Sequence, residues 1–121
     1  MVRIVNETRG TVVAQDVRIA DGIWSRFRGL MLRASLPQGQ GLLIRPSSSI
    51  HTMFMRFPID VLFLDRQNQV VKVVHEIRPC RAALSKGHSA LELAAGSAAR
   101  AGVEAGDRLV LVDAHEGRNG G

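Results

Sequence analysis

Residues 49–65 read SIHTMFMRFPIDVLFLD and form the stretch around which the rest of the chain is expected to be organised. If the first half is a strand, successive side chains point to opposite faces, so His51, Met53, Met55 and Phe57 share one face. Pro58 interrupts the run, because proline has no N–H to donate to a neighbouring strand. The pattern predicts two strands, at about residues 49–56 and 59–64, that meet at a bend beside Pro58.

On both sides of this stretch, short apolar runs alternate with turns rich in Gly, Pro, Asn or Asp. These runs predict further strands at residues 2–5, 11–20, 41–45, 69–77, 89–96 and 108–112. The first two are expected to form an N-terminal hairpin, and the strand at 59–64 is expected to form a second hairpin with the strand at 69–77. Residues 78–88 are expected to form a loop.

The sequence predicts a helix in two segments of the chain. Apolar residues at helical spacing predict a short amphipathic helix at about residues 22–32, with Asp21 as its N-cap. Ser97 is expected to cap a helical turn near residues 97–101.

Many short strands with Gly and Pro turns indicate a mainly β fold, a single-domain β-sandwich or barrel. The 121 residues match one domain, expected at 1–113 and followed by a flexible tail at 114–121. The chain is 45% hydrophobic and 22% charged, which favours a packed core over disorder. It has no apolar run of membrane-spanning length and no apolar signal core, so a cytoplasmic location without a membrane partner is expected.

The formal net charge is +5, and its distribution is uneven. Residues 22–59 contain no acidic residue and five arginines: Arg26, Arg28, Arg33, Arg45 and Arg56. A local positive field favours an anionic partner, whereas arginines scattered over a solvated surface explain the same composition without one. Aromatic residues make up only 4% of the chain, so a base-stacking platform is not expected.

Metal chemistry finds weak support in the sequence. His51, Met53 and Met55 would share a strand face and form a soft site suited to Cu(I), but methionines facing a core explain the pattern better. The remaining candidate ligands match no short zinc signature: His51, His75, His88, Asp60 and Glu92. No cofactor is therefore expected. Cys80 is the single cysteine and is interpreted as a free thiol.

Asp60 and Glu92 are acids embedded in apolar runs. A buried carboxylate is expected to be paired, and Arg26 or Arg56 is the natural partner. If the two carboxylates shared a cleft, general acid–base catalysis would be possible, with His51 and a metal as further participants. The structural ion pair is the favoured interpretation.

Four runs occur in an order that resembles the DUF192 family of small bacterial and archaeal proteins: RFRGLM from Arg26, PIDVLFLD from Pro58, LELAAG from Leu91 and GVEAGD from Gly102. The resemblance spans about residues 10–112. It implies a compact, mainly β, sandwich-like domain and no settled activity. It also implies a set of site positions: Arg26, Gly29, Pro58, Asp60, Glu92 and Gly96. The glycines and the proline among them, together with Gly106, are expected to set backbone geometry. Many relatives read Trp-Met-Lys-Asn-Thr where this chain reads HTMFM at 51–55.

The leading hypothesis is a non-catalytic ligand-binding or protein-interaction module, whose partner is a small anionic ligand or a protein. Its candidate binding residues are Arg26, His51, Arg56, Asp60 and Glu92. One alternative is a metal-assisted or acid–base hydrolase that uses Asp60, Glu92 and His51. Another is nucleic-acid binding through the arginine-rich segment 22–59.

Overall fold

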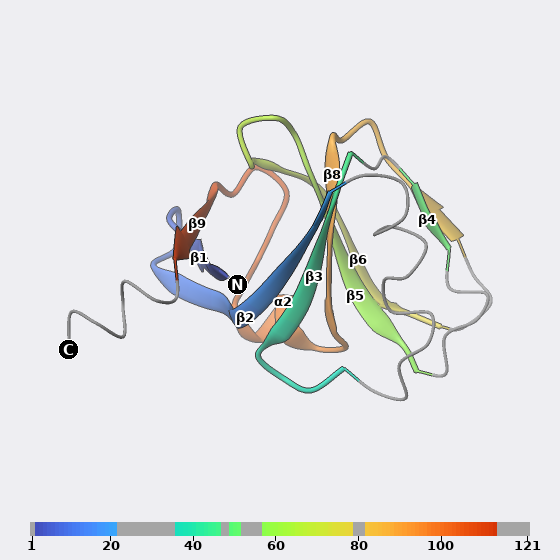
Figure 1. The fold of residues 1–121 in the computed structure, drawn as a ribbon, viewed down its shortest axis with the longest axis horizontal. Coiled ribbons are helices and arrows are strands. Elements are labelled where there is room, and N and C mark those ends of the chain that lie inside the picture. The colour runs from blue at the N-terminus through green and yellow to red at the C-terminus, as the bar shows by residue number, and fades with distance from the viewer. Residues whose placement is uncertain (1, 22–35, 47–48, 52–56, 79–81, 114–121) are drawn as a thin grey trace.

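A seven-stranded sheet forms the frame of the molecule (Figure 1). The computed structural model describes residues 2–21, 36–46, 49–51, 57–78 and 82–113. Its elements are β1 (Val2–Asn6), β2 (Thr11–Asp21), β3 (Gln40–Arg45), β4 (Ser49–His51), β5 (Ile59–Leu64), β6 (Val70–Ile77), β7 (Ala82–Leu84), β8 (Ser89–Ala94), α2 (Ser97–Arg100) and β9 (Leu109–Asp113). The strand order is β6-β5-β8-β3-β2-β1-β9, while β4 and β7 pair as a separate small sheet. The predicted mainly β fold class is confirmed.

The large sheet curls until its two edge strands approach each other at one end. An isolated bridge joins Gln69, beside β6, to Arg108, beside β9. The Val70 N–H donates to the Asp107 carbonyl at 2.7 Å, and the Leu109 N–H donates to the Asn68 carbonyl at 2.9 Å. The sheet is thus a barrel closed at this end. No helix in the described ranges has the length and apolar character needed to cross a membrane.

Curling gives the sheet an inner and an outer face, and each face has its own apolar cluster. The inner cluster includes Leu62, Leu64, Leu91 and Leu93, together with residues of α2 and of every other strand in the large sheet. The outer cluster includes Val61, Phe63, Ala90 and Ala94, with Ala83 of β7 packed among them. Because neighbouring residues of a strand alternate between faces, β5 and β8 are buried on both sides.

Most of the expected strands are confirmed. β1 pairs with β2 and β5 pairs with β6, both antiparallel, as the two predicted hairpins. The segment at 89–96 has a helix-like composition, but β8 forms there because it is paired on both edges, with β3 and β5. β2 and β3 pair in parallel, an arrangement that requires a long crossover, here residues 22–39.

Three expectations need correction or stay open. The loop expected at 78–88 contains β7, whose three short apolar residues form a strand because β4 lies beside them. Ser97 is the first residue of α2 rather than its cap: the N-cap is Gly96, with φ of 89° and no capping side chain. The helix expected at 22–32 and part of the strand expected at 49–56 fall outside the described residues.

Candidate functional site

Asp60 is fully buried on the inner face of β5 and has two backbone donors. Its Oδ1 accepts a hydrogen bond from the Glu76 N–H at 2.8 Å, and its Oδ2 accepts one from the Ala98 N–H at 2.9 Å. Glu76 sits at an irregularity of β6 with a positive φ of 48°. Asp60 therefore fastens the first turn of α2 and a strained part of β6 to the central strand β5.

Glu92 lies in the middle of β8 on the opposite, outer face. Its neighbours in register are Leu42 of β3 and Val61 of β5, both apolar. The residue is only 5% exposed, and in the part of the chain that the structure describes its carboxyl group has no hydrogen-bond donor. Burial raises the pKa of Glu92 to about 7, because the apolar surroundings disfavour the charged form.

The two carboxylates do not share a cleft. In the β5–β8 register Asp60 is opposite Leu93, and Val61 is opposite Glu92. Residues that are opposite each other in an antiparallel pair point to the same face, so Asp60 points into the barrel and Glu92 points out of it. The hypothesis of a hydrolase built on both carboxylates in one cleft is therefore wrong.

Only some of the other residues predicted from the sequence fall within the described ranges. Six of them lie outside the described residues: Arg26, Gly29, Met53, Met55, Arg56 and Cys80. For His51, only the backbone pairing with Ala82 is described. Pro58 is exposed directly before β5, and Gly96 and Gly106 adopt positive φ angles of 89° and 97°. Both φ angles lie in the left-handed region, which glycine adopts more readily than residues with a side chain. Within the described ranges, no three His, Cys, Asp or Glu side chains gather as metal ligands would.

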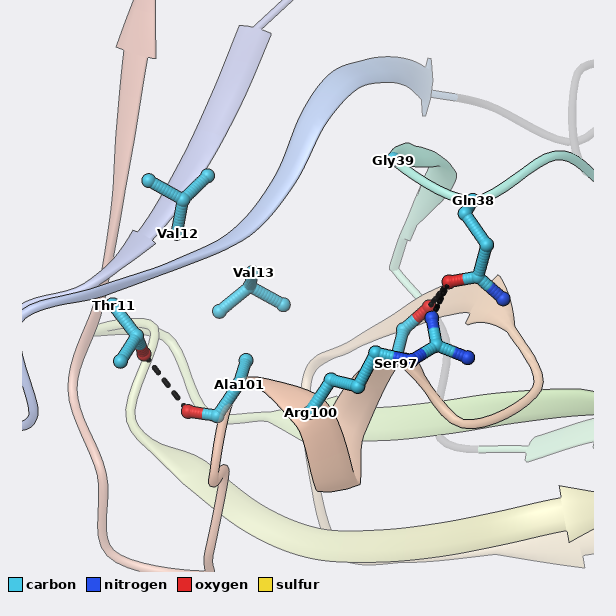
Figure 2. A pocket seen from close by; sticks show the side chains of 8 residues that line it. All are labelled: Thr11, Val12, Val13, Gln38, Gly39, Ser97, Arg100 and Ala101. Atoms are coloured by element: carbon cyan, nitrogen blue, oxygen red, sulfur yellow. Dashed lines mark hydrogen bonds between the residues drawn. The ribbon is translucent and has the colours of Figure 1, made fainter.

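A shallow pocket of about 200 Å³ lies between β2, the turn before β3 and α2 (Figure 2). The side chain of Arg100 reaches the Oε1 atom of Gln38, which also accepts a hydrogen bond from the Ser97 hydroxyl at 3.2 Å. At the other end, the Thr11 hydroxyl donates to the Ala101 carbonyl at 2.8 Å. Arg100 is the one charged residue among those lining this pocket.

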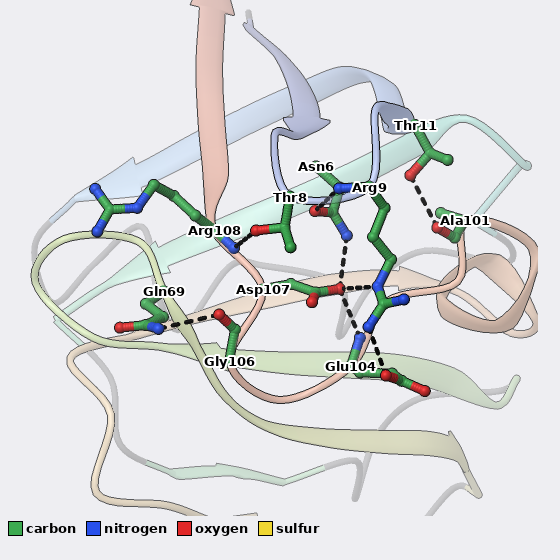
Figure 3. Close-up of polar contacts among 10 residues, drawn as sticks. All are labelled: Asn6, Thr8, Arg9, Thr11, Gln69, Ala101, Glu104, Gly106, Asp107 and Arg108. Carbon is green, nitrogen blue, oxygen red and sulfur yellow. Dashed lines mark hydrogen bonds and ion pairs between the residues drawn. The ribbon is translucent and has the colours of Figure 1, made fainter.

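A polar cluster around Asp107 links the end of β1 and the turn after it to the turn before β9 (Figure 3). Asp107 Oδ2 accepts hydrogen bonds from Asn6 Nδ2 at 2.8 Å, Arg9 Nε at 2.7 Å and the Glu104 N–H at 3.0 Å. The hydrogen bond from Arg9 holds the pKa of Asp107 down at about 2. In the sequence this segment appears only as the run GVEAGD from Gly102, with nothing that points to Asn6 or Arg9. An acid that follows Gly106 in a tight turn was the one available signal.

The comparisons with known proteins agree on one family. The model of the DUF192 family, described as "Uncharacterized ACR", matches residues 4–111. A UPF0127 protein of Pyrococcus furiosus is 34% identical over 113 residues, covering 88% of this chain and 95% of that protein. A UPF0127 protein of Thermococcus sibiricus is 39% identical over 88 residues, covering 69% of this chain. The match covers about half of the length of this and two other Thermococcus relatives.

Two solved structures share the fold. One, described as a putative transcription regulator from Sinorhizobium meliloti, has a TM-score of 0.75 at 25% identity and covers 91% of both chains. The other, a protein of unknown function from Novosphingobium aromaticivorans, has a TM-score of 0.74 at 21% identity and covers 90% of this chain and 82% of its own. On the evidence of the family model and of the UPF0127 relatives, the chain belongs to the DUF192 family, which is uncharacterised.

Proposed function

We propose that this protein is a non-catalytic binding module that holds a small ligand or a protein segment on the outer face of the barrel, with Glu92 as a polar contact. The observation that carries the proposal is the environment of Glu92, a carboxyl group buried between Leu42 and Val61 without a donor among the described residues. Such a group costs stability, and residues that break the rules of a stable core tend to serve function.

The sequence adds candidate contacts to this surface. The segment 22–35 is flanked by Asp21 and Leu36, and both Ala20 and Leu36 belong to the outer cluster. Phe57 also packs against this cluster and directly follows Arg56. Arg26, His51 and Arg56 therefore remain the proposed contacts for an anionic group, while Glu92 favours a ligand group that donates a hydrogen bond.

The first experiment is native mass spectrometry of the purified protein beside its denatured mass, followed by thermal-shift screening of small amines, carboxylates and phosphates. Glu92→Gln keeps the shape of the side chain and removes its charge, so it should weaken a ligand bound through Glu92. Glu7→Gln changes an exposed carboxylate and serves as the matched control. If Glu92→Gln, Arg26→Gln, His51→Asn and Arg56→Gln all leave the ligand bound, the outer face is not the site.

Nucleic-acid binding is the second candidate. Two observations favour it: the net charge of +5 and the similarity to the structure described as a putative transcription regulator. Binding of this kind depends on phosphate contacts, so its affinity falls steeply as salt rises. Fluorescence anisotropy with a labelled duplex over a series of salt concentrations tests it, and absent or salt-independent binding would remove this candidate.

We also propose that residues 1–113 form one domain and that residues 114–121 form a flexible tail. The proposed location of the protein is the cytoplasm. Limited proteolysis followed by mass spectrometry tests the domain boundary. A single protected fragment that ends near residue 113 is the expected product.

A further inference from the structure

We propose that the pocket bounded by Gln38, Ser97 and Arg100 binds a small oxyanion, that is, a phosphate or carboxylate group. None of the pocket's lining residues belongs to the outer cluster around Glu92, so this site is independent of the function proposed above. Its volume of about 200 Å³ is smaller than the ~300–1,000 Å³ typical of pockets for drug-sized ligands, which suits a small group.

The charge balance of the pocket favours an anion. Arg100 brings a guanidinium group to the pocket, and no acidic side chain lines it. Its acceptor there is the neutral amide of Gln38, so the positive charge is not compensated within the pocket. Arg9 provides the contrast, because it pairs with two carboxylates, Asp107 and Glu104.

Neighbouring groups orient both donors, although Arg100 is exposed. Ser97 is buried and its hydroxyl donates to Gln38 Oε1, the atom that Arg100 Nη1 also reaches. The guanidinium lies against Gly96, where an added Cβ would come within 2.9 Å of Nη2. Gln38 makes one further side-chain contact, at the exposed surface, in which its Nε2 donates to the Ala95 carbonyl at 3.1 Å. A guanidinium held in this way loses less freedom when it binds an anion.

The Gln38 amide oxygen marks where an oxygen of the ligand would sit. Two donors from α2, the Ser97 hydroxyl and Arg100 Nη1, converge on that atom (Figure 2). Gln38 lies in an exposed turn, so its side chain can move aside for a ligand oxygen that carries full charge. Charge-assisted hydrogen bonds are stronger than neutral ones, and guanidinium groups bind carboxylate and phosphate in a two-pronged geometry.

The test is an NMR titration of the full chain with sodium phosphate and, separately, sodium acetate, each compared with sodium chloride at equal ionic strength. We expect the amide signals of Gly39, Ser97 and Arg100 to shift and saturate with at least one oxyanion and not with chloride. The oxyanion that saturates the shifts distinguishes a phosphate group from a carboxylate group as the ligand.

Three variants decide whether the pocket carries the effect. Arg100→Gln removes the cation, and Gln38→Glu supplies an internal carboxylate for it; each should weaken binding by at least about tenfold. Arg108→Gln removes an exposed cation outside the pocket and should bind as the unmodified protein does. Saturating shifts that survive in Arg100→Gln, or shifts that chloride reproduces, would overturn the proposal. The amide spectra also report whether each variant is folded.

Discussion

Asp60 and Glu92 lie on neighbouring central strands, one step apart in register, and are both buried, yet their surroundings are opposite. Asp60 points into the barrel, where the N–H groups of Glu76 and Ala98 satisfy both of its oxygens. Glu92 points outward into an apolar wall that offers no donor among the described residues. The difference shows that burial alone does not assign a role to a carboxylate. Asp60 stabilises the fold, whereas Glu92 costs stability and is the residue that we propose for binding.

Replacement of Asp60 should have the largest effect. Asp60→Ala leaves two backbone N–H groups without acceptors, one buried and one partly buried, at a cost of roughly 4 kcal/mol in the free energy of unfolding. Asp65→Ala is the matched control, because Asp65 also accepts from two backbone N–H groups, those of Gln67 and Gln69, but in an exposed turn. Urea denaturation measures both variants. If Asp60→Ala costs no more than Asp65→Ala, the structural role assigned to Asp60 is incorrect.

Replacement of Glu92 should act in the opposite direction and depend on pH. Because the pKa rises from 4.5 to about 7 on folding, the folded protein binds the extra proton between these values. Stability should therefore fall by roughly 3 kcal/mol as the pH rises from about 4.5 to about 7. Glu92→Gln should remove this slope and make the protein more stable than wild type at pH 8. Glu7→Gln should keep this dependence of stability on pH. If Glu92→Gln also keeps it, the contrast between Glu92 and Asp60 is wrong.

Asp107 extends the comparison to a carboxylate with a cationic partner. Asp107→Asn weakens the contacts to Asn6 and Arg9 and should cost about 2 kcal/mol in the free energy of unfolding. The folded pKa of about 2 lies below the ordinary 3.8, so the stability from this carboxylate is present above pH 3.8 and lost as the pH falls toward 2. Acid denaturation followed by circular dichroism should begin at a higher pH in Arg9→Ala than in Arg108→Ala. Equal acid midpoints would contradict this role.

The smallest effect concerns Gly96, the N-cap of the helix α2 that Asp60 anchors, and Gly106, in the turn before β9. Gly96→Ala and Gly106→Ala both place a side chain at positive φ, at a cost of about 1 kcal/mol each. An added Cβ at Gly96 also meets Arg100, whereas at Gly106 it meets nothing within 4 Å. Gly96→Ala should therefore destabilise more in thermal unfolding. If Arg100→Ala is introduced first, the difference between the two glycine variants should shrink.

Much of the fold follows from local sequence patterns. Short apolar runs and turn residues predicted the hairpins and most of the strands, because most strands of the sheet are short and bounded by turns. The same patterns identified Asp60 and Glu92 as buried acids. They did not show which face each acid occupies, since that depends on the β5–β8 pairing and on the irregularity in β6.

Other features lay beyond local patterns because they depend on contacts between distant residues. Asn6 and Asp107 are 101 positions apart, and neither residue alone predicts their hydrogen bond. The capping of α2 was assigned to Ser97, the nearest polar residue, whereas the acceptor is Asp60, 38 positions before Ala98. β7 was missed because three apolar residues become a strand only beside β4.

The most direct test is an NMR titration of the side-chain carboxyl groups of glutamate, with Glu92→Gln used to assign the signal of Glu92. A pKa near 7 is the result that the account predicts, because it requires an apolar environment without a positively charged partner. A pKa at or below 4.5 would mean that a cation of the chain pairs with Glu92. Glu92 would then belong to a structural ion pair, as Asp107 does with Arg9. The proposed binding site on the outer face would be contradicted.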